Sequence, residues 1–192
     1  MSIVKKNAGF SLIELIVVLS IMSILAAGVV SIVLSRSDWS CRKASDLIST
    51  TLSETRADAL AKTNAWMQIE YDSTEGYILK TSYAADVKLG TQCEIYYETS
   101  QGGGEKLLNA DGSSVNPLTL SFARGSGEFL GIITAVNQQT AADGSPYVVY
   151  DYLQDSGKNV YCTKLVVRKG SGGHQYVITL YPETGKYSCE RE

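Results

Sequence analysis

A single carboxylate lies inside a long apolar stretch near the N-terminus. Glu14 is the only charged residue between Asn7 and Ser35. A charge at the centre of a membrane-spanning helix costs about 2.5–3.5 kcal/mol, and a residue kept there despite that cost usually has a partner and a function. Glu14 is therefore the first residue for which we expect a chemical role.

Few other side chains are suited to chemistry. His174 is the only histidine and lies in a glycine-rich turn, whereas a hydrolytic site needs a nucleophile beside a base that a third group holds. The four cysteines are Cys41, Cys93, Cys162 and Cys189, and none belongs to a C-x₂-C pair of the kind that indicates zinc. We therefore predict no catalytic residues, no metal site and no cofactor.

The apolar stretch at 10–34 is long enough to cross a membrane as a helix. Its length corresponds to about 37 Å, which exceeds the hydrocarbon core of about 30 Å. A lone strand would leave its backbone groups unpaired in lipid. Lys5 and Lys6 precede the stretch, so the positive-inside rule keeps the short N-terminus in the cytoplasm and places the rest of the chain outside it.

A secretory signal peptide is the alternative interpretation of this stretch. The start is basic, and the segment Leu-Ala-Ala at 25–27 could serve as a small-residue cleavage site. Against it, the apolar stretch continues to residue 34, and Glu14 lies where a signal peptide is wholly apolar.

The segment 35–64 has the pattern of an amphipathic helix. Apolar or small residues recur at spacings of three and four, with charged residues between them. The helix is therefore predicted to run from Phe10 to about Lys62, and a break near residues 35–37 is the alternative. The predicted stripe consists of Ala44, Ile48, Leu52, Thr55 and Ala59, with Leu47, Thr51 and Leu60 beside it.

From residue 65 the pattern changes to the alternation of β-strands. Glycine-rich turns separate the apolar segments, and the turn at 72–75 predicts a hairpin. We expect one antiparallel sheet set against the helix. The predicted strands are 66–72, 76–82, 92–98, 118–123, 128–134, 146–152, 160–169, 175–181 and 185–189.

An external location permits disulfides. Four cysteines allow three complete pairings, and the sequence does not choose among them. Cys162 and Cys189 both lie in C-terminal strands and are a candidate pair, whereas Cys41, near the membrane, is expected to stay unpaired. Four reduced thiols are the alternative.

The N-terminal segment resembles the type IV prepilins and the pseudopilins of type II secretion. The resemblance rests on a short basic leader, on Gly9 and Phe10, on Glu14, and on the apolar helix that follows. It implies that prepilin peptidase cuts after Gly9 and that Phe10 is then N-methylated. The new ammonium of Phe10 would pair with Glu14 of a neighbouring subunit, so that two costly charges neutralise each other only in the correct register.

The remainder of the chain is similar to H-type minor pseudopilins and to FimT/FimU-like minor pilins. The corresponding residues are Arg56, Ala59, Phe122, Gly125, Gly185 and Lys186, and the segment 136–157 looks like an insertion.

Some FimT-like proteins bind DNA through basic C-terminal residues, and Lys164, Arg168, Lys169 and His174 gather near one turn. The formal net charge of −3 becomes two units more negative once the leader lysines are removed. A solvated hairpin face is therefore preferred to a DNA site.

Together these observations predict an α+β, type IV pilin-like fold in which one long helix packs on a C-terminal antiparallel β-sheet domain. The predicted divisions are a leader at 1–9, a transmembrane or filament-core helix at 10–34, its amphipathic continuation at 35–64, and a β-rich head at 65–192. The predicted location is the inner membrane, with the head outside the cytoplasm, and later the filament.

The predicted function is that of a non-enzymatic filament subunit, a minor pilin or pseudopilin of a type IV pilus or type II secretion machine. Its expected partners are prepilin peptidase, other pilin subunits, the inner-membrane assembly platform and, before assembly, lipid. The alternative is a membrane-anchored module, for DNA uptake or adhesion, that does not polymerise.

Overall fold

The computed structural model describes residues 12–61, 65–109, 115–170 and 174–192, without the side chains of 27–38 and 146–147. The chain divides into two compact units, Met1–Ser37 and Asp38–Glu192. We call the second unit the head and describe each unit by itself.

One helix, α1, spans Leu12–Ala61. Its first half is rich in apolar residues, and its second half shows the amphipathic spacing expected of a helix that packs on one side. The helix continues through residues 35–37, where the sequence allowed a break. The described part of α1 ends at Ala61, and residues 62–64 lie outside the described residues, so the end near Lys62 stays a prediction.

The other elements are strands, most of them at the predicted positions. They are β1 (Ala65–Asp72), β2 (Gly76–Thr81), β3 (Val87–Gly90), β4 (Glu94–Thr99), β5 (Lys106–Leu107), β6 (Leu118–Phe122), β7 (Phe129–Thr140), β8 (Pro146–Tyr152), β9 (Gln154–Asp155), β10 (Lys158–Asn159), β11 (Cys162–Arg168), β12 (Gln175–Tyr181) and β13 (Lys186–Arg191).

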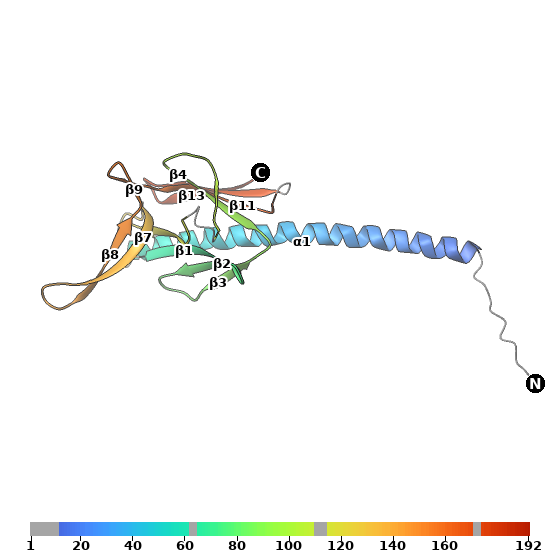
Figure 1. Cartoon of the computed structure of the whole chain (residues 1–192), viewed down its shortest axis with the longest axis horizontal. Helices are drawn as coiled ribbons and strands as arrows, with labels where there is room; N and C mark the ends of the chain where they lie inside the picture. Colours follow the sequence, from blue (N-terminus) through green and yellow to red (C-terminus); the bar gives the residue numbers. More distant parts are fainter. Residues whose placement is uncertain (1–11, 62–64, 110–114, 171–173) are drawn as a thin grey trace, which may run out of the picture. The chain divides into compact units, whose positions relative to one another are not determined.

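The strands form two main antiparallel sheets, not the single sheet that we expected. One has the order β3-β2-β1-β6-β7-β8 and the other the order β13-β12-β11-β4-β5, while β9 and β10 form a small ribbon. Figure 1 shows the two sheets on opposite sides of the part of α1 that belongs to the head. A helix with a sheet on either side can bury apolar residues on more than one face.

A single hydrophobic core joins these layers. Ile48 and Leu52 of α1 are almost fully buried, together with Met67 of the first sheet and Leu165 and Ile178 of the second. The predicted α+β fold, with an N-terminal helix packed on antiparallel strands, is therefore confirmed.

The segment 136–157 extends the sheet by a long hairpin. The first residues of β7 are buried, but Ala135–Thr140 are exposed and pair with β8 beyond the core. In Figure 1 this hairpin, coloured yellow to orange, reaches away from the rest of the head. The remainder of the segment contains β9 and β10.

Candidate processing, assembly and head-anchoring sites

The predicted cleavage site lies outside the described residues. Gly9 and Phe10 precede Leu12, where α1 begins. Cleavage after Gly9 and methylation of Phe10 therefore stay predictions.

Glu14 lies in the first turn of α1, where a carboxylate interacts favourably with the positive end of the helix dipole. Its side chain is exposed in the isolated chain. A carboxylate that pairs with a newly formed terminal ammonium has to lie close to the N-terminus of the helix, and Glu14 does so. The predicted role of Glu14 in assembly nevertheless stays a prediction.

The large apolar side chains around Glu14 are also exposed. Their exposed fractions lie between 49% and 78%. An apolar surface of this extent needs a cover, which a lipid bilayer or neighbouring subunits can supply. The residues are Leu12, Ile13, Leu15, Ile16, Val17, Val18, Leu19, Ile21, Met22, Ile24 and Leu25.

Two hydroxyl groups in this stretch are satisfied within the helix. Ser20 Oγ donates to the carbonyl oxygen of Ile16 at 2.8 Å, and Ser23 Oγ donates to that of Leu19 at 2.7 Å. Bonds of this kind let a serine lie in an apolar environment without water. These two serines are thus compatible with burial in lipid or in a filament.

No helix formed by the described residues combines the length and the hydropathy that a membrane crossing requires. The predicted span at 10–34 includes residues 10 and 11 and the side chains of 27–34, which lie outside the description. The span therefore stays a prediction.

Within the head, α1 packs through the predicted stripe. The exposed fraction is 2% or less for every residue of the main stripe, namely Ala44, Ile48, Leu52, Thr55 and Ala59. Leu60, which was expected beside them, is 47% exposed, because its side chain follows Ala59 around the helix and leaves the buried face.

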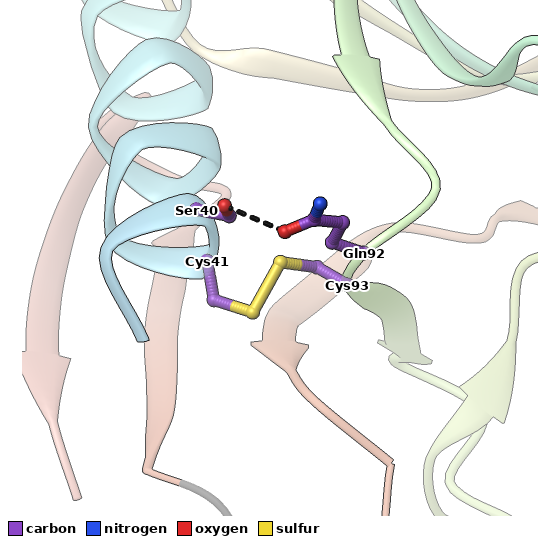
Figure 2. Close-up of a disulfide and its surroundings, with 4 residues drawn as sticks. All are labelled: Ser40, Cys41, Gln92 and Cys93. Atoms are coloured by element: carbon purple, nitrogen blue, oxygen red, sulfur yellow. Dashed lines mark hydrogen bonds between the residues drawn. A yellow bond between two sulfur atoms is a disulfide. The ribbon is translucent and has the colours of Figure 1, made fainter. Parts of the chain in front are cut away.

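A disulfide bridge fixes α1 to the segment before β4. It joins Cys41 and Cys93, whose Cα atoms are 5.5 Å apart. Figure 2 shows a hydrogen bond beside it, in which Ser40 Oγ donates to Gln92 Oε1 at 3.0 Å. Both cysteines are buried, with exposed fractions of 1% and 6%. The expectation that Cys41 stays unpaired is therefore wrong.

The predicted Cys162–Cys189 bridge is also wrong, because both residues are free cysteines. Cys162 lies in β11 and Cys189 in β13, and β12 separates these two strands in the sheet. Strands two positions apart are about 9–10 Å distant, whereas bridged cysteines need Cα atoms within about 7 Å. The sheet order thus excludes the pair.

The two free thiols differ in environment. Cys162 is buried, and burial raises the pKa of its thiol to about 12. Cys189 is exposed, and its Sγ lies 3.4 Å from Ser45 Oγ of α1. Because a reagent must reach the sulfur and the thiolate is the reactive form, the buried Cys162 is protected, and Cys189 is the accessible free thiol.

Three segments that are distant in the sequence meet at one place: the end of α1, the turn between β6 and β7, and the turn between β12 and β13. The carbonyl oxygen of Ala59, close to the end of the described part of α1, accepts a hydrogen bond from the Gly125 N–H at 3.3 Å. Carbonyl groups at helix ends need such partners from outside the helix. Arg56 Nε donates to the Gly127 oxygen at 3.3 Å. We call this meeting point the helix-end junction.

The β12–β13 turn completes the helix-end junction. A Cβ atom on Gly185 would lie 1.6 Å from the oxygen of Gly127, and the φ angle of Gly185 is +62°. Only glycine permits this approach and this backbone conformation without strain. Arg56, Gly125 and Gly185, which carried the resemblance in the sequence, are thus brought together by the fold.

A carboxylate partly neutralises the basic cluster of Lys164, Arg168, Lys169 and His174. Glu105 forms ion pairs with Lys164 at 3.3 Å and with Arg168 at 3.2 Å. The guanidinium of Arg168 also lies 3.9 Å from the ring centre of Tyr96. Lys169 and His174 are exposed. Glu105 was not singled out in the sequence, because its partners lie about 60 residues away along the chain.

Residues 4–30 match the family model described as the prokaryotic N-terminal methylation motif. No similar protein was found among curated sequences, and no similar fold among solved structures. The motif places the chain in the type IV pilin and pseudopilin superfamily. It does not distinguish the H-type or the FimT/FimU-like subgroup.

The same motif has consequences for processing and location. It implies processing by prepilin peptidase and, before assembly, anchoring in the inner membrane through the N-terminal segment. Members of this superfamily are typically structural proteins without enzymatic activity.

Proposed function

We propose that the chain is a minor pilin or pseudopilin, which prepilin peptidase cuts after Gly9 and which is then N-methylated on Phe10. The mature subunit is assembled through its N-terminal helix into a type IV pilus or a type II secretion filament. The observation that carries this proposal is the match of residues 4–30 to the methylation motif.

The exposed apolar face of α1 supports assembly through the helix. A filament core covers this face with equivalent helices of neighbouring subunits, much as lipid covers it before assembly. In such a core the terminal ammonium of Phe10 and the carboxylate of Glu14 on a neighbour neutralise each other. The register of the subunits then follows from the pairing of these two charges.

The helix-end junction supports a closer relation to the H-type and FimT/FimU-like subunits. Residues that carry the resemblance to the subgroup also lie together in the structure. Arg56 and Ala59 form hydrogen bonds with the turn that contains Gly125 and Gly127. We propose membership of this subgroup on that ground.

Processing is tested by the mass of the exported protein. Wild type should lose residues 1–9 and gain one methyl group on Phe10. Replacement Gly9→Leu should block the cut, because the scissile bond must enter a narrow site in the peptidase. Gly28→Ala is the matched control and should be processed normally. A mature mass for Gly9→Leu equal to that of wild type would refute the proposal.

Assembly is tested at Glu14. Glu14→Ala makes the helix more apolar and should not impair membrane insertion. It should reduce the ratio of filament-bound to membrane-held protein by a factor of at least about a hundred, since an unpaired buried charge costs about 3–5 kcal/mol. Glu14→Gln should lie between, because its amide oxygen still accepts a hydrogen bond. Equal ratios for the three proteins would show that the carboxylate does not set the register.

A further inference from the structure

A cavity of about 810 Å³ opens on the head beside the β12–β13 turn. Its aromatic and apolar lining comes from Tyr161, Tyr181, Tyr187, Phe129 and Pro182, and its polar lining from Glu128, Glu183, Thr184 and Lys186. We call it the tyrosine cavity. Its volume lies within the range of sites that bind ligands, which is about 300–1,000 Å³.

The walls of the tyrosine cavity are held by hydrogen bonds. The Phe129 N–H donates to the carbonyl oxygen of Pro182 at 3.1 Å and so joins β7 to the turn after β12. The hydroxyl of Tyr187 lies 2.7 Å from Ser53 Oγ of α1. The backbone N–H of Tyr161 donates to Ser100 Oγ at 3.1 Å. A ligand therefore meets a cavity that is already formed, which limits the entropy lost on binding.

The charged residues of the tyrosine cavity favour a cation. Glu128 and Glu183 contribute two carboxylates and Lys186 one ammonium, and all three side chains are exposed. Among the ion pairs of the described residues, none involves these three side chains. The faces of tyrosine rings also attract cations, through the negative side of the ring quadrupole. Carboxylates and rings thus act in the same direction, and Lys186 opposes them.

Elsewhere in the head, a cationic side chain already lies between a tyrosine ring and a carboxylate. Arg168 lies over the ring of Tyr96 and pairs with Glu105, so that a guanidinium is held by one tyrosine face and one carboxylate. The tyrosine cavity offers the same two kinds of group. Among the described residues that line it, Lys186 is the one cation. An incoming guanidinium would find equivalent contacts.

We propose that the tyrosine cavity binds an arginine or lysine side chain presented by a segment of another protein. The cavity is larger than one side chain and open to solvent, so that residues flanking the cation also fit. Tyr181, which is 49% exposed, stacks on the cation, and Glu183 neutralises it. This inference does not depend on the proposed filament role.

The test uses the full chain in an uncharged detergent, with tyrosine rings labelled for NMR. The probe is an acetylated and amidated pentapeptide with the sequence Gly-Ser-Arg-Ser-Gly, and its matched control carries citrulline, which is neutral and has nearly the same shape. The arginine peptide should shift the ring signals of Tyr161, Tyr181 and Tyr187 and should bind about 5- to 10-fold more tightly than the citrulline peptide.

Exposed variants separate charge from shape. Glu183→Gln should weaken binding of the arginine peptide about 3- to 10-fold, and Lys186→Gln should strengthen it about 3-fold, because one removes an attractive charge and the other a repulsive one. Glu190→Gln, also exposed on β13 but outside the cavity lining, is the control and should bind as wild type does. Tyr181→Ala should lose at least 5-fold.

Several results would overturn the inference. These are equal binding of the arginine and citrulline peptides, an unchanged affinity in Lys186→Gln, and no shift of the three ring signals at 10 mM peptide. Tighter binding of a neutral oligosaccharide than of the peptide would also overturn it. Glu183→Gln and Lys186→Gln alter only exposed charges, so the test remains decisive even if Tyr181→Ala does not fold.

Discussion

Replacing Cys41 and Cys93 together by alanine should lower the free energy of unfolding of the head by about 4 kcal/mol. The bridge joins residues 52 positions apart, and the chain-entropy relation gives about 4 kcal/mol for a loop of that length. The effect comes mainly from the unfolded chain, which gains conformations when the cross-link is absent. For a unit of this size, the midpoint of thermal unfolding should fall by about 8–16 °C.

The assay is urea unfolding of the full chain in detergent, followed by tyrosine and tryptophan fluorescence. Either single replacement, Cys41→Ala or Cys93→Ala, should cost about as much as both together, since each removes the same cross-link. Cys189→Ala is the control, because this exposed cysteine is free and its removal leaves the bridge intact. Wild type treated with a reductant after unfolding should refold with the stability of the double variant.

Two results would refute this reasoning. A loss below about 1 kcal/mol in the double variant would mean that the loop is not closed by this bridge. A peptide map of the non-reduced protein that joins Cys162 to Cys189 would mean that the order of the strands is different.

Three further predictions concern the head. Gly185→Ala should lower the free energy of unfolding by at least about 3 kcal/mol, because the new Cβ would meet a backbone oxygen. Gly102→Ala is the control, because Gly102 has a φ of +75° but open space around it, and it should cost only about 1 kcal/mol. Urea unfolding of the two variants measures both losses. Iodoacetamide at pH 7.5 should alkylate Cys189 and spare Cys162, as mass spectrometry of the folded protein would show. Burial raises the pKa of Tyr77 to about 12, so the stability that it contributes should be present below pH 10 and be lost between pH 10 and 12. Tyr77→Phe should reduce this alkaline loss, and an unchanged loss would refute the assignment.

Local patterns were predictable because their cause is local. The alternation in 66–72 and 175–181 reflects side chains that point to opposite faces of a strand, and it can be recognised without knowing the neighbouring strand. The spacing of Ala44, Ile48 and Leu52 likewise follows from the helical period. The short strands β3 and β5 were missed, since two to four residues carry too little periodicity and only pairing with β2 and β4 defines them.

The sequence by itself determined the N-terminal motif, the single carboxylate at Glu14 and the change from helix to strands near residue 65, because each depends on neighbouring residues. Only the tertiary structure decided which cysteines pair, since the partner of Cys41 depends on where β4 lies and not on spacing along the chain. The same holds for the helix-end junction and for the tyrosine cavity, each of which combines three segments that are separate in the sequence. Contacts of this kind depend on sheet order and register, and these follow from the packing of the whole head.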